Sequence, residues 1–360
     1  MRSVVQRNLS RYLLASALTI CALPALACQP VGHVRPGRGV RDEVHALFVA
    51  KDYDSLDRLA RRYEREGTGT FDGRSALEVF YQGIEDGFTG CASGRKADAD
   101  WEEHEHALQA WIDASKDPVP ARLALARFTV DYAWQARGSG YASTVGDRAM
   151  ALFRERLALA RSRFEALATL CEDNAAWYDG MLTIAKAQHM DTAAFESLYR
   201  KAVRADPYFE NVHFQHADYF RPQWYGSPKQ FRGAIEQAVK ATSPRLGTAM
   251  YAKLHWSLSE SDTMFTDGSV DWKRMKGGFE DALRTYPSVW VRSNYARLAC
   301  EAKDSATLRV QMDNLGDQVR KDAWDNPDYF IYCQAMAKLD GTGREPQCFK
   351  REDNGQVFCE

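Results

Sequence analysis

Three side chains with the chemistry of metal ligands fall on one predicted helix face. Glu210, His213 and His216 are spaced three residues apart, which aligns them along one side of an α-helix. A zinc site needs three or four such ligands that converge on one point, and the sequence offers no fourth ligand. His104 and His106 diverge by roughly 200° around a helix, so one helix cannot aim both at one metal. We therefore interpret these residues as ordinary helix-surface or groove residues and predict no metal site.

Nucleophilic catalysis has no recognisable arrangement in this chain. There is no Gly-x-Ser-x-Gly elbow, and no cysteine has a local signature that would pair it with a histidine. Cys171 ends a predicted helix and Cys300 lies on a predicted buried helix face, so we expect both to be free structural thiols that behave as small hydrophobic residues. The sequence predicts no catalytic residue and no cofactor.

Two segments rich in aromatic residues are the best candidates for a binding surface. Trp134, Arg137 and Tyr141 surround a Gly-Ser-Gly turn at the end of a predicted helix. A phosphate-binding loop would follow a strand, so we interpret these glycines as a helix end and turn. The second segment contains Trp224 and Tyr225 in a turn between helices, where aromatic rings either pack the helices together or line a groove. We predict that these five residues bind a ligand or partner.

Helical periodicity dominates the elements that must position these candidates. After Asp191, Ser227 and Asp271, apolar residues recur at i, i+3, i+4, i+7 and i+8, and each of these three residues is a typical N-cap. The segments 97–115, 120–137 and 145–170 also predict helices, because they are rich in Ala, Leu and Arg and poor in β-branched residues.

Prolines mark a repeat in the second half of the chain. We expect Pro207, Pro244, Pro287 and Pro327 each to start a helix, and they are 37, 43 and 40 residues apart. This quasi-period is typical of stacked two-helix units, and a further unit is expected to begin near Asn174. The sequence therefore predicts an all-α fold, an α-solenoid of stacked antiparallel helix pairs of tetratricopeptide-like type.

The two halves share one kind of helix joint. Ala50-Lys51-Asp52 and Ala302-Lys303-Asp304 both read as a turn that ends one helix and caps the next. We expect an N-terminal helical region over 40–172 and a helix-pair repeat region over 173–340.

A short cysteine-containing tail is expected over 341–360. Asp353-Asn354-Gly355 is a turn signal between two short apolar runs, which predicts a hairpin. A disulfide between Cys348 and Cys359 would close it. A two-residue turn would place these cysteines diagonally, near the limit of disulfide geometry, so a slightly longer loop is expected.

The N-terminus has the pattern of a secretory signal. Three arginines precede an apolar stretch that is too short to span a bilayer, and Ala25-Leu26-Ala27 forms a small-x-small cleavage site. We predict a signal peptide over 1–27 and a linker over 28–39. Cleavage would expose Cys28, as in a bacterial lipoprotein, although such signals usually carry Leu where this chain has Ala25. A lipid anchor on Cys28 and a soluble periplasmic protein both stay open.

Composition excludes several classes of function. The 47 basic residues nearly balance the 49 acidic residues, so no basic excess would drive binding to nucleic acid. The mean hydropathy of -0.48 excludes a polytopic membrane protein, which leaves the signal peptide or a lipid anchor as the only membrane contact.

Several short sequence segments resemble those of a known family. The segments 52–57, 132–142, 223–226 and 271–279 are similar to the bacterial family called domain of unknown function 4034, and the resemblance extends from about Arg41 to Trp324. It implies a helical fold related to tetratricopeptide-like repeats and carries no catalytic residues to transfer.

Together these features predict an exported, non-catalytic protein that binds or scaffolds a peptide, protein or cell-envelope partner. The alternative is an enzyme or small-ligand-binding protein with a site near the loop 134–141.

Overall fold

The computed structural model describes residues 38–67, 69–70, 73–89, 98–138, 140, 142–259, 264–265, 268–324, 326–339, 346–351 and 357–359. The chain divides into two units, Met1–Gly32 and His33–Glu360, and all described residues belong to the second. The expected signal peptide, Cys28 and Tyr141 lie outside the described residues.

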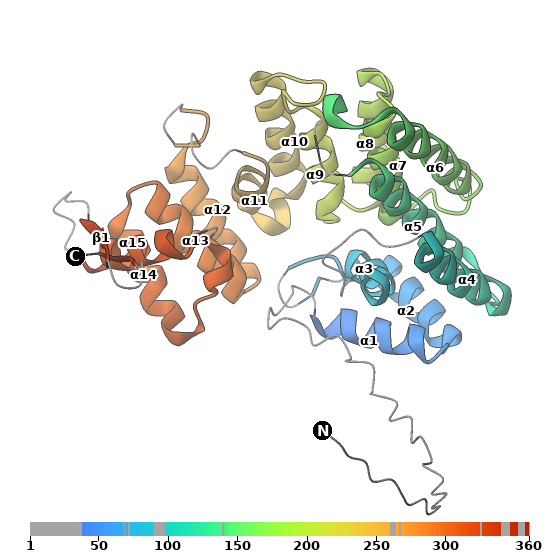
Figure 1. Ribbon diagram of the computed structural model, residues 1–360, viewed down its shortest axis with the longest axis horizontal. Coiled ribbons are helices and arrows are strands. Elements are labelled where there is room, and N and C mark those ends of the chain that lie inside the picture. The colour runs from blue at the N-terminus through green and yellow to red at the C-terminus, as the bar shows by residue number, and fades with distance from the viewer. Residues whose placement is uncertain are drawn as a thin grey trace, which may run out of the picture. The chain divides into compact units, whose positions relative to one another are not determined.

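The all-α fold is confirmed. In the described residues fifteen α-helices follow one another, with one small hairpin near the C-terminus (Figure 1). The elements are α1 (Arg38–Val49), α2 (Tyr53–Glu66), α3 (Ala76–Thr89), α4 (Asp98–Ala114), α5 (Val119–Arg137), α6 (Asp147–Glu165), α7 (Ala175–Ala187), α8 (Thr192–Ala205), α9 (Glu210–Tyr219), α10 (Pro228–Leu246), α11 (Ala249–Leu258), α12 (Trp272–Thr285), α13 (Val289–Glu301), α14 (Ser305–Leu315), α15 (Pro327–Lys338), β1 (Cys348–Lys350) and β2 (Val357–Cys359). The first helix starts at Arg38, inside the expected linker 28–39.

The predicted N-caps are confirmed by their hydrogen bonds. The Asp191 side chain accepts from the first backbone N–H groups of α8, the Ser227 hydroxyl accepts from the Gln230 N–H, and Asp271 caps α12 in the same way. Asn174 caps α7, where the additional unit was expected to begin. These caps satisfy amide groups that would otherwise lack a partner at a helix start.

The prolines fit the predicted repeat only in part. Pro327 starts α15, whereas Pro207 and Pro287 lie in the turns just before α9 and α13. Pro244 was expected to start a helix, and that prediction is wrong because it lies inside the last turn of α10. The carbonyl of Lys240, which Pro244 cannot engage for lack of an N–H, accepts a hydrogen bond from the Ser243 hydroxyl instead.

Two kinds of helix alternate along the chain. The even-numbered helices from α2 to α14, which we call the outer helices, bury one stripe of residues, as α8 does with Phe195, Tyr199 and Ala202. The odd-numbered helices from α3 to α13, the inner helices, are buried around most of their circumference. From α5 to α13, each inner helix contacts the outer helices before and after it in sequence, and α3 contacts α2. Consecutive inner helices from α3 to α11 also contact each other. This alternation confirms the stacked helix pairs.

The same helix-ending geometry occurs at three places in the chain. Lys51, His189 and Lys303 all have positive φ angles, of 55°, 55° and 58°, at the ends of α1, α7 and α13. In each case this residue and the next donate their N–H groups back across the last helical turn. This Schellman arrangement satisfies carbonyls at the helix end and turns the chain toward the following outer helix. The predicted similarity of the Lys51 and Lys303 joints is confirmed.

The cysteines bear out one expectation and overturn another. The disulfide between Cys348 and Cys359 is present, and these residues lie directly opposite each other in the β1–β2 hairpin, whose last pair is Lys350 with Val357. The connection is thus longer than two residues, as expected. Cys300, however, is not a free thiol, because it forms a disulfide with Cys333 that joins α13 to α15. The sequence could not show this pairing, because packing alone brings the two Cα atoms to 5.7 Å.

Cys171 remains a free thiol, as expected. It is buried, and burial raises its pKa to about 12, so the thiol stays protonated and unreactive.

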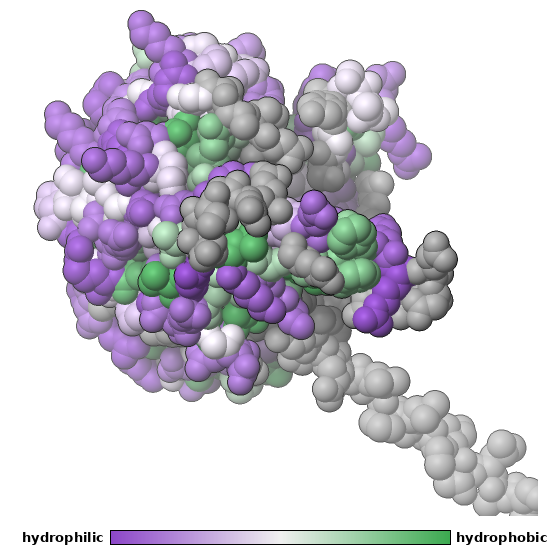
Figure 2. All heavy atoms as spheres, turned by 90° about the vertical axis from the view of Figure 1, so that its left-hand side faces the viewer, coloured by the Kyte–Doolittle hydropathy of each residue, from purple (hydrophilic) through white to green (hydrophobic). Residues whose placement is uncertain are grey.

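The one face of the protein that Figure 2 draws is largely hydrophilic where residues are coloured. On the face drawn in Figure 2, hydrophilic residues cover most of the area and hydrophobic residues form separate patches. None of the described helices combines the length and the apolar character needed to cross a membrane.

Candidate functional site

The two predicted binding segments meet in the folded protein. Trp134 and Arg137 lie in the last turn of α5, and Trp224 and Tyr225 lie in the turn between α9 and α10. The rings of Trp134 and Trp224 are 6.4 Å apart between centroids and nearly perpendicular, at 85°. With Lys186 of α7, these residues form what we call the Trp134–Trp224 surface.

Local backbone geometry sets the position of both tryptophans. The end of α5 is closed by Gly138, which has a φ of 73° and donates its N–H to the Trp134 carbonyl. The Trp134 ring packs at 5.0 Å from Phe153 of α6. In the other segment the chain folds back so tightly that a Cβ on Gly226 would collide with the backbone of Phe220. Glycine at these two places allows the aromatic residues to approach each other.

Tyr225 is a packing residue. Its hydroxyl donates to the Lys186 carbonyl at 2.8 Å, and its ring stacks on His189 with 4.1 Å between centroids. Burial raises the pKa of the Tyr225 phenol, so this hydroxyl acts as a hydrogen-bond donor. It anchors the turn that carries Trp224 to the end of α7.

Two cations contact the tryptophan rings in different ways. The Lys186 ammonium lies 5.0 Å from the Trp224 ring centroid and forms an ion pair with Asp218 at 2.5 Å. The Arg137 guanidinium lies 5.2 Å from the Trp134 ring centroid and donates to the adjacent Gly138 carbonyl. Among the described residues no carboxylate pairs with Arg137, so its positive charge stays available at the surface.

A hollow of about 430 Å³ adjoins Arg137. It is lined by the end of α5 and the segment that leads into α6, including Gly138, Thr144 and Ala149. The described residues of this lining include no acid or base besides Arg137. The geometry suits contact with a side chain or a small molecule, and those lining residues offer no group for proton transfer at neutral pH.

The potential metal ligands Glu210, His213 and His216 point to separate partners. Glu210 pairs with Lys253 at 2.5 Å, and the Glu196 carboxylate accepts a hydrogen bond from His216 at 3.1 Å. Both histidines are completely buried, which differs from the expected surface or groove position. Nowhere in the described part of the chain do three or more metal-ligating side chains converge.

The environment of His213 keeps it neutral. Its Nδ1 accepts from the Tyr199 hydroxyl and its Nε2–H donates to the Pro207 carbonyl, both at 2.8 Å. Burial lowers the pKa of His213 to about 4 and also lowers the pKa of His216, so the contact of His216 with Glu196 is a hydrogen bond from a neutral imidazole.

A ladder of charges between inner helices was not predicted. Arg127 of α5 pairs with Asp179 of α7 at 3.0 Å, and Lys186 of α7 pairs with Asp218 of α9. The pair of Glu210 and Lys253 continues the ladder to α11. The sequence signal that could have indicated this ladder is the presence of charged residues inside otherwise apolar helices such as 119–137 and 175–187.

A further carboxylate faces this ladder. Burial raises the pKa of Asp131 on α5 to about 6, an effect that the nearby charge of Asp179 reinforces and that of Arg127 opposes. The inner helices therefore hold acidic groups in surroundings that penalise their charge.

The comparisons with known proteins give one result. Residues 41–189 match the model of a family described as "Domain of unknown function (DUF4034)". No curated protein and no solved structure matches the chain. The match covers α1 to α7 and confirms the resemblance there, including Trp134 and Arg137, but it ends before the similar phrases at 223–226 and 271–279.

Proposed function

We propose the role of this protein from its geometry, because the family model that residues 41–189 match is described only as a domain of unknown function. It is a non-catalytic binding protein that recognises a protein or peptide partner through the Trp134–Trp224 surface. The observation that carries this proposal is the meeting of two tryptophans, from segments far apart in sequence, beside an arginine that lacks a described carboxylate partner.

The energetics of interfaces support a protein or peptide partner. Tryptophan and arginine are the residue types that most often dominate binding energy, because they bury a large area and retain polar contacts. The Trp134 ring holds the Arg137 guanidinium in place before binding, which lowers the entropy lost in the complex. Trp134 and Trp224 are only half-buried, so part of each ring is available to a partner.

The hollow beside Arg137 supports the alternative of a small ligand. A volume of about 430 Å³ falls within the range of ligand pockets. We favour the partner-binding role because the described lining lacks the paired acid and base that catalysis would use.

The test compares three variants of the purified protein. Arg137→Ala and Trp224→Ala should each weaken capture of a partner from cell-envelope extracts by about tenfold or more. Arg154→Ala, at an exposed arginine of α6, is the matched control and should capture as well as the wild type. Circular dichroism should show the same helicity in all three. Unchanged capture by Arg137→Ala and Trp224→Ala would contradict the proposal, and turnover in a hydrolase or transferase screen that these variants abolish would favour an enzyme.

We further propose that the protein is exported, with a cleaved signal peptide over 1–27. The support is the pattern of arginines, apolar stretch and small-x-small site in the sequence. Mass spectrometry of the mature protein should find Cys28 as its first residue, and an added lipid mass would place it on a membrane. A mature chain that retains residues 1–27 would contradict export by this route.

A further inference from the structure

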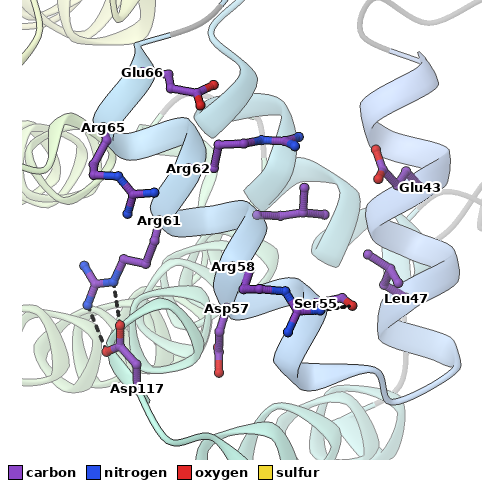
Figure 3. Close-up of a pocket in the computed structure, with 11 residues that line it drawn as sticks. Glu43, Leu47, Ser55, Asp57, Arg58, Arg61, Arg62, Arg65, Glu66 and Asp117 are labelled. Atoms are coloured by element: carbon purple, nitrogen blue, oxygen red, sulfur yellow. Dashed lines mark hydrogen bonds and ion pairs between the residues drawn. The ribbon is translucent and has the colours of Figure 1, made fainter.

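A second surface feature lies between α1 and α2. An open groove of about 690 Å³ is lined on α2 by Arg58, Arg61, Arg62 and Arg65, and on α1 by Glu43 and Leu47 (Figure 3). The four arginines have the spacing i, i+3, i+4 and i+7, which places them on the side of α2 away from its buried leucines. Such a concentration of guanidinium groups on one helix is repulsive unless anions lie nearby.

Two of the acidic residues that line the groove are already engaged. Asp117 accepts two hydrogen bonds from Arg61, at 2.6 and 2.9 Å, so these two charges neutralise each other. Asp57 accepts from the indole N–H of Trp111 at 3.0 Å and from the Ser115 hydroxyl. Neither carboxylate compensates the other three arginines.

Among the described residues, Arg58, Arg62 and Arg65 form no close ion pair with a carboxylate, although hydrogen bonds from Ser55 and, to a smaller extent, the charge of Arg58 lower the pKa of Asp52 at the start of α2. Arg58 donates to the Ser55 hydroxyl at 2.9 Å, and Arg62 donates to the Tyr63 hydroxyl at 3.2 Å. All three side chains are exposed. Arg58 and Arg62 extend from α2 toward α1, across the groove (Figure 3). Elsewhere many arginines of this protein, such as Arg127 and Arg274, do pair with carboxylates.

We propose that this groove binds an extended acidic peptide segment of a partner protein. Arg58 and Arg62 are separated by about 6 Å along the helix axis, at 1.5 Å per residue. Carboxylates at alternate positions of an extended chain are separated by about 6.6 Å and point the same way, so they match this pair. Arg65, three residues beyond Arg62, starts from the other side of α2 in Figure 3 and adds positive charge beside this pair. Guanidinium groups bind carboxylates with two parallel hydrogen bonds, which gives the contact its direction.

The rest of the groove favours a peptide over a denser polyanion. Leu47, which is partly exposed, provides an apolar contact for a side chain between the carboxylates. Glu43 and Glu66 stand at the walls and repel closely spaced phosphates, whereas a peptide can place neutral or basic residues beside them. This proposal involves other residues than the Trp134–Trp224 surface and does not depend on it.

The experiment uses the full chain and a fluorescent capped peptide with glutamate at alternate positions and serine or leucine between them. Fluorescence anisotropy should show binding at low ionic strength, about 20 mM, that weakens at about 300 mM. Arg62→Ala should weaken binding about fivefold, and the triple change of Arg58, Arg62 and Arg65 to Ala by about fiftyfold or more. Glu43→Gln should strengthen it about twofold, because it removes a like charge from the site.

Controls separate this site from general charge attraction. Arg154→Ala should bind the peptide as the wild type does, because that exposed arginine lies on α6. A peptide with lysine in place of glutamate should not bind. The proposal is overturned if the triple variant binds as tightly as the wild type, or if inorganic tripolyphosphate displaces the peptide at a lower concentration than unlabelled peptide does.

Discussion

Ion pairs that join inner helices are more deeply buried than ion pairs within a single outer helix. The pair of Arg161 with Glu165 lies within the outer helix α6, and both side chains are about half exposed. Inner helices place charges between helices, as with Arg127 and Asp179, whose side chains are 11% and 5% exposed. Removing one partner of an ion pair therefore lowers stability more on an inner helix than on an outer helix, because the cost of an unpaired charge rises steeply with burial.

This difference predicts where the protein is fragile. An outer pair contributes little to stability, since water solvates either partner alone. An inner pair holds one helix against the next. Removing one partner leaves the other as a buried charge that neither water nor a counter-ion stabilises. We expect substitutions on inner helices to be far more damaging than equivalent substitutions on outer helices.

The largest expected effect comes from breaking the inner pair. Arg127→Met keeps most of the side-chain volume but leaves the buried Asp179 without the guanidinium that it pairs with. It should lower the free energy of unfolding by about 3 to 5 kcal/mol. The outer control, Arg161→Met, should cost less than about 1 kcal/mol. Urea unfolding followed by circular dichroism measures both. Adding Asp179→Leu to Arg127→Met should restore part of the loss, and equal effects of the two single variants would refute the distinction.

Acid should reveal the buried imidazole of His213. Its pKa is about 4 in the folded protein against an ordinary value of 6.5, so between these pH values the unfolded chain binds the extra proton and the folded state does not. Stability from this residue therefore falls as the pH is lowered from 6.5 to 4, by up to about 3 kcal/mol. His213→Gln should flatten that decline in urea unfolding measured across this range.

Other groups titrate in the same window and remain in the variant. His255, with a pKa of about 4, acts with the same sign, whereas Asp131, whose pKa is raised to about 6, gains stability as it is protonated. The informative quantity is the difference in pH dependence between the wild type and His213→Gln. His106 is exposed, so His106→Gln is the control and should leave the pH dependence of stability nearly unchanged. A change as large as that of His213→Gln would argue against burial as the cause.

Glycine substitutions should give the smallest effects, with opposite signs. A Cβ on Gly180, in inner α7, would collide with the ring of Phe164, which is completely buried, so Gly180→Ala should cost about 1 to 3 kcal/mol. Gly233, in outer α10, has no neighbouring atom within 4 Å of the corresponding position. Gly233→Ala should therefore stabilise the protein by about 0.5 to 1 kcal/mol. Thermal unfolding would show a lowered and a raised midpoint, and shifts in the same direction would count against this picture.

Outer helices are easier to recognise from the sequence than inner helices. The stripes of α8, α10 and α12 were predicted from periodicity, because an outer helix has one dry and one wet face. The inner helices lack this contrast, so their polar residues Arg127, Asp179 and Lys186 were not recognised as a buried ladder. Pro244 was misplaced because its sequence signal cannot show that the last turn of α10 is held by the burial of Thr242 and Leu246.

The candidate site was predicted in parts. The sequence indicated Trp134 with Arg137, and Trp224 with Tyr225, as two separate surfaces, and the fold joined them at 6.4 Å between the tryptophan rings. It left packing and groove-lining open for Trp224 and Tyr225, and the structure shows that Tyr225 packs the turn against the end of α7.

By itself the sequence determined the helices, their caps, the three-residue joints and the hairpin disulfide, because each depends on residues close together along the chain. The tertiary structure alone decided the Cys300–Cys333 disulfide, the ladder of buried charges and the meeting of Trp134 with Trp224. Those contacts join residues tens of positions apart, and their distances are set by how successive helices stack.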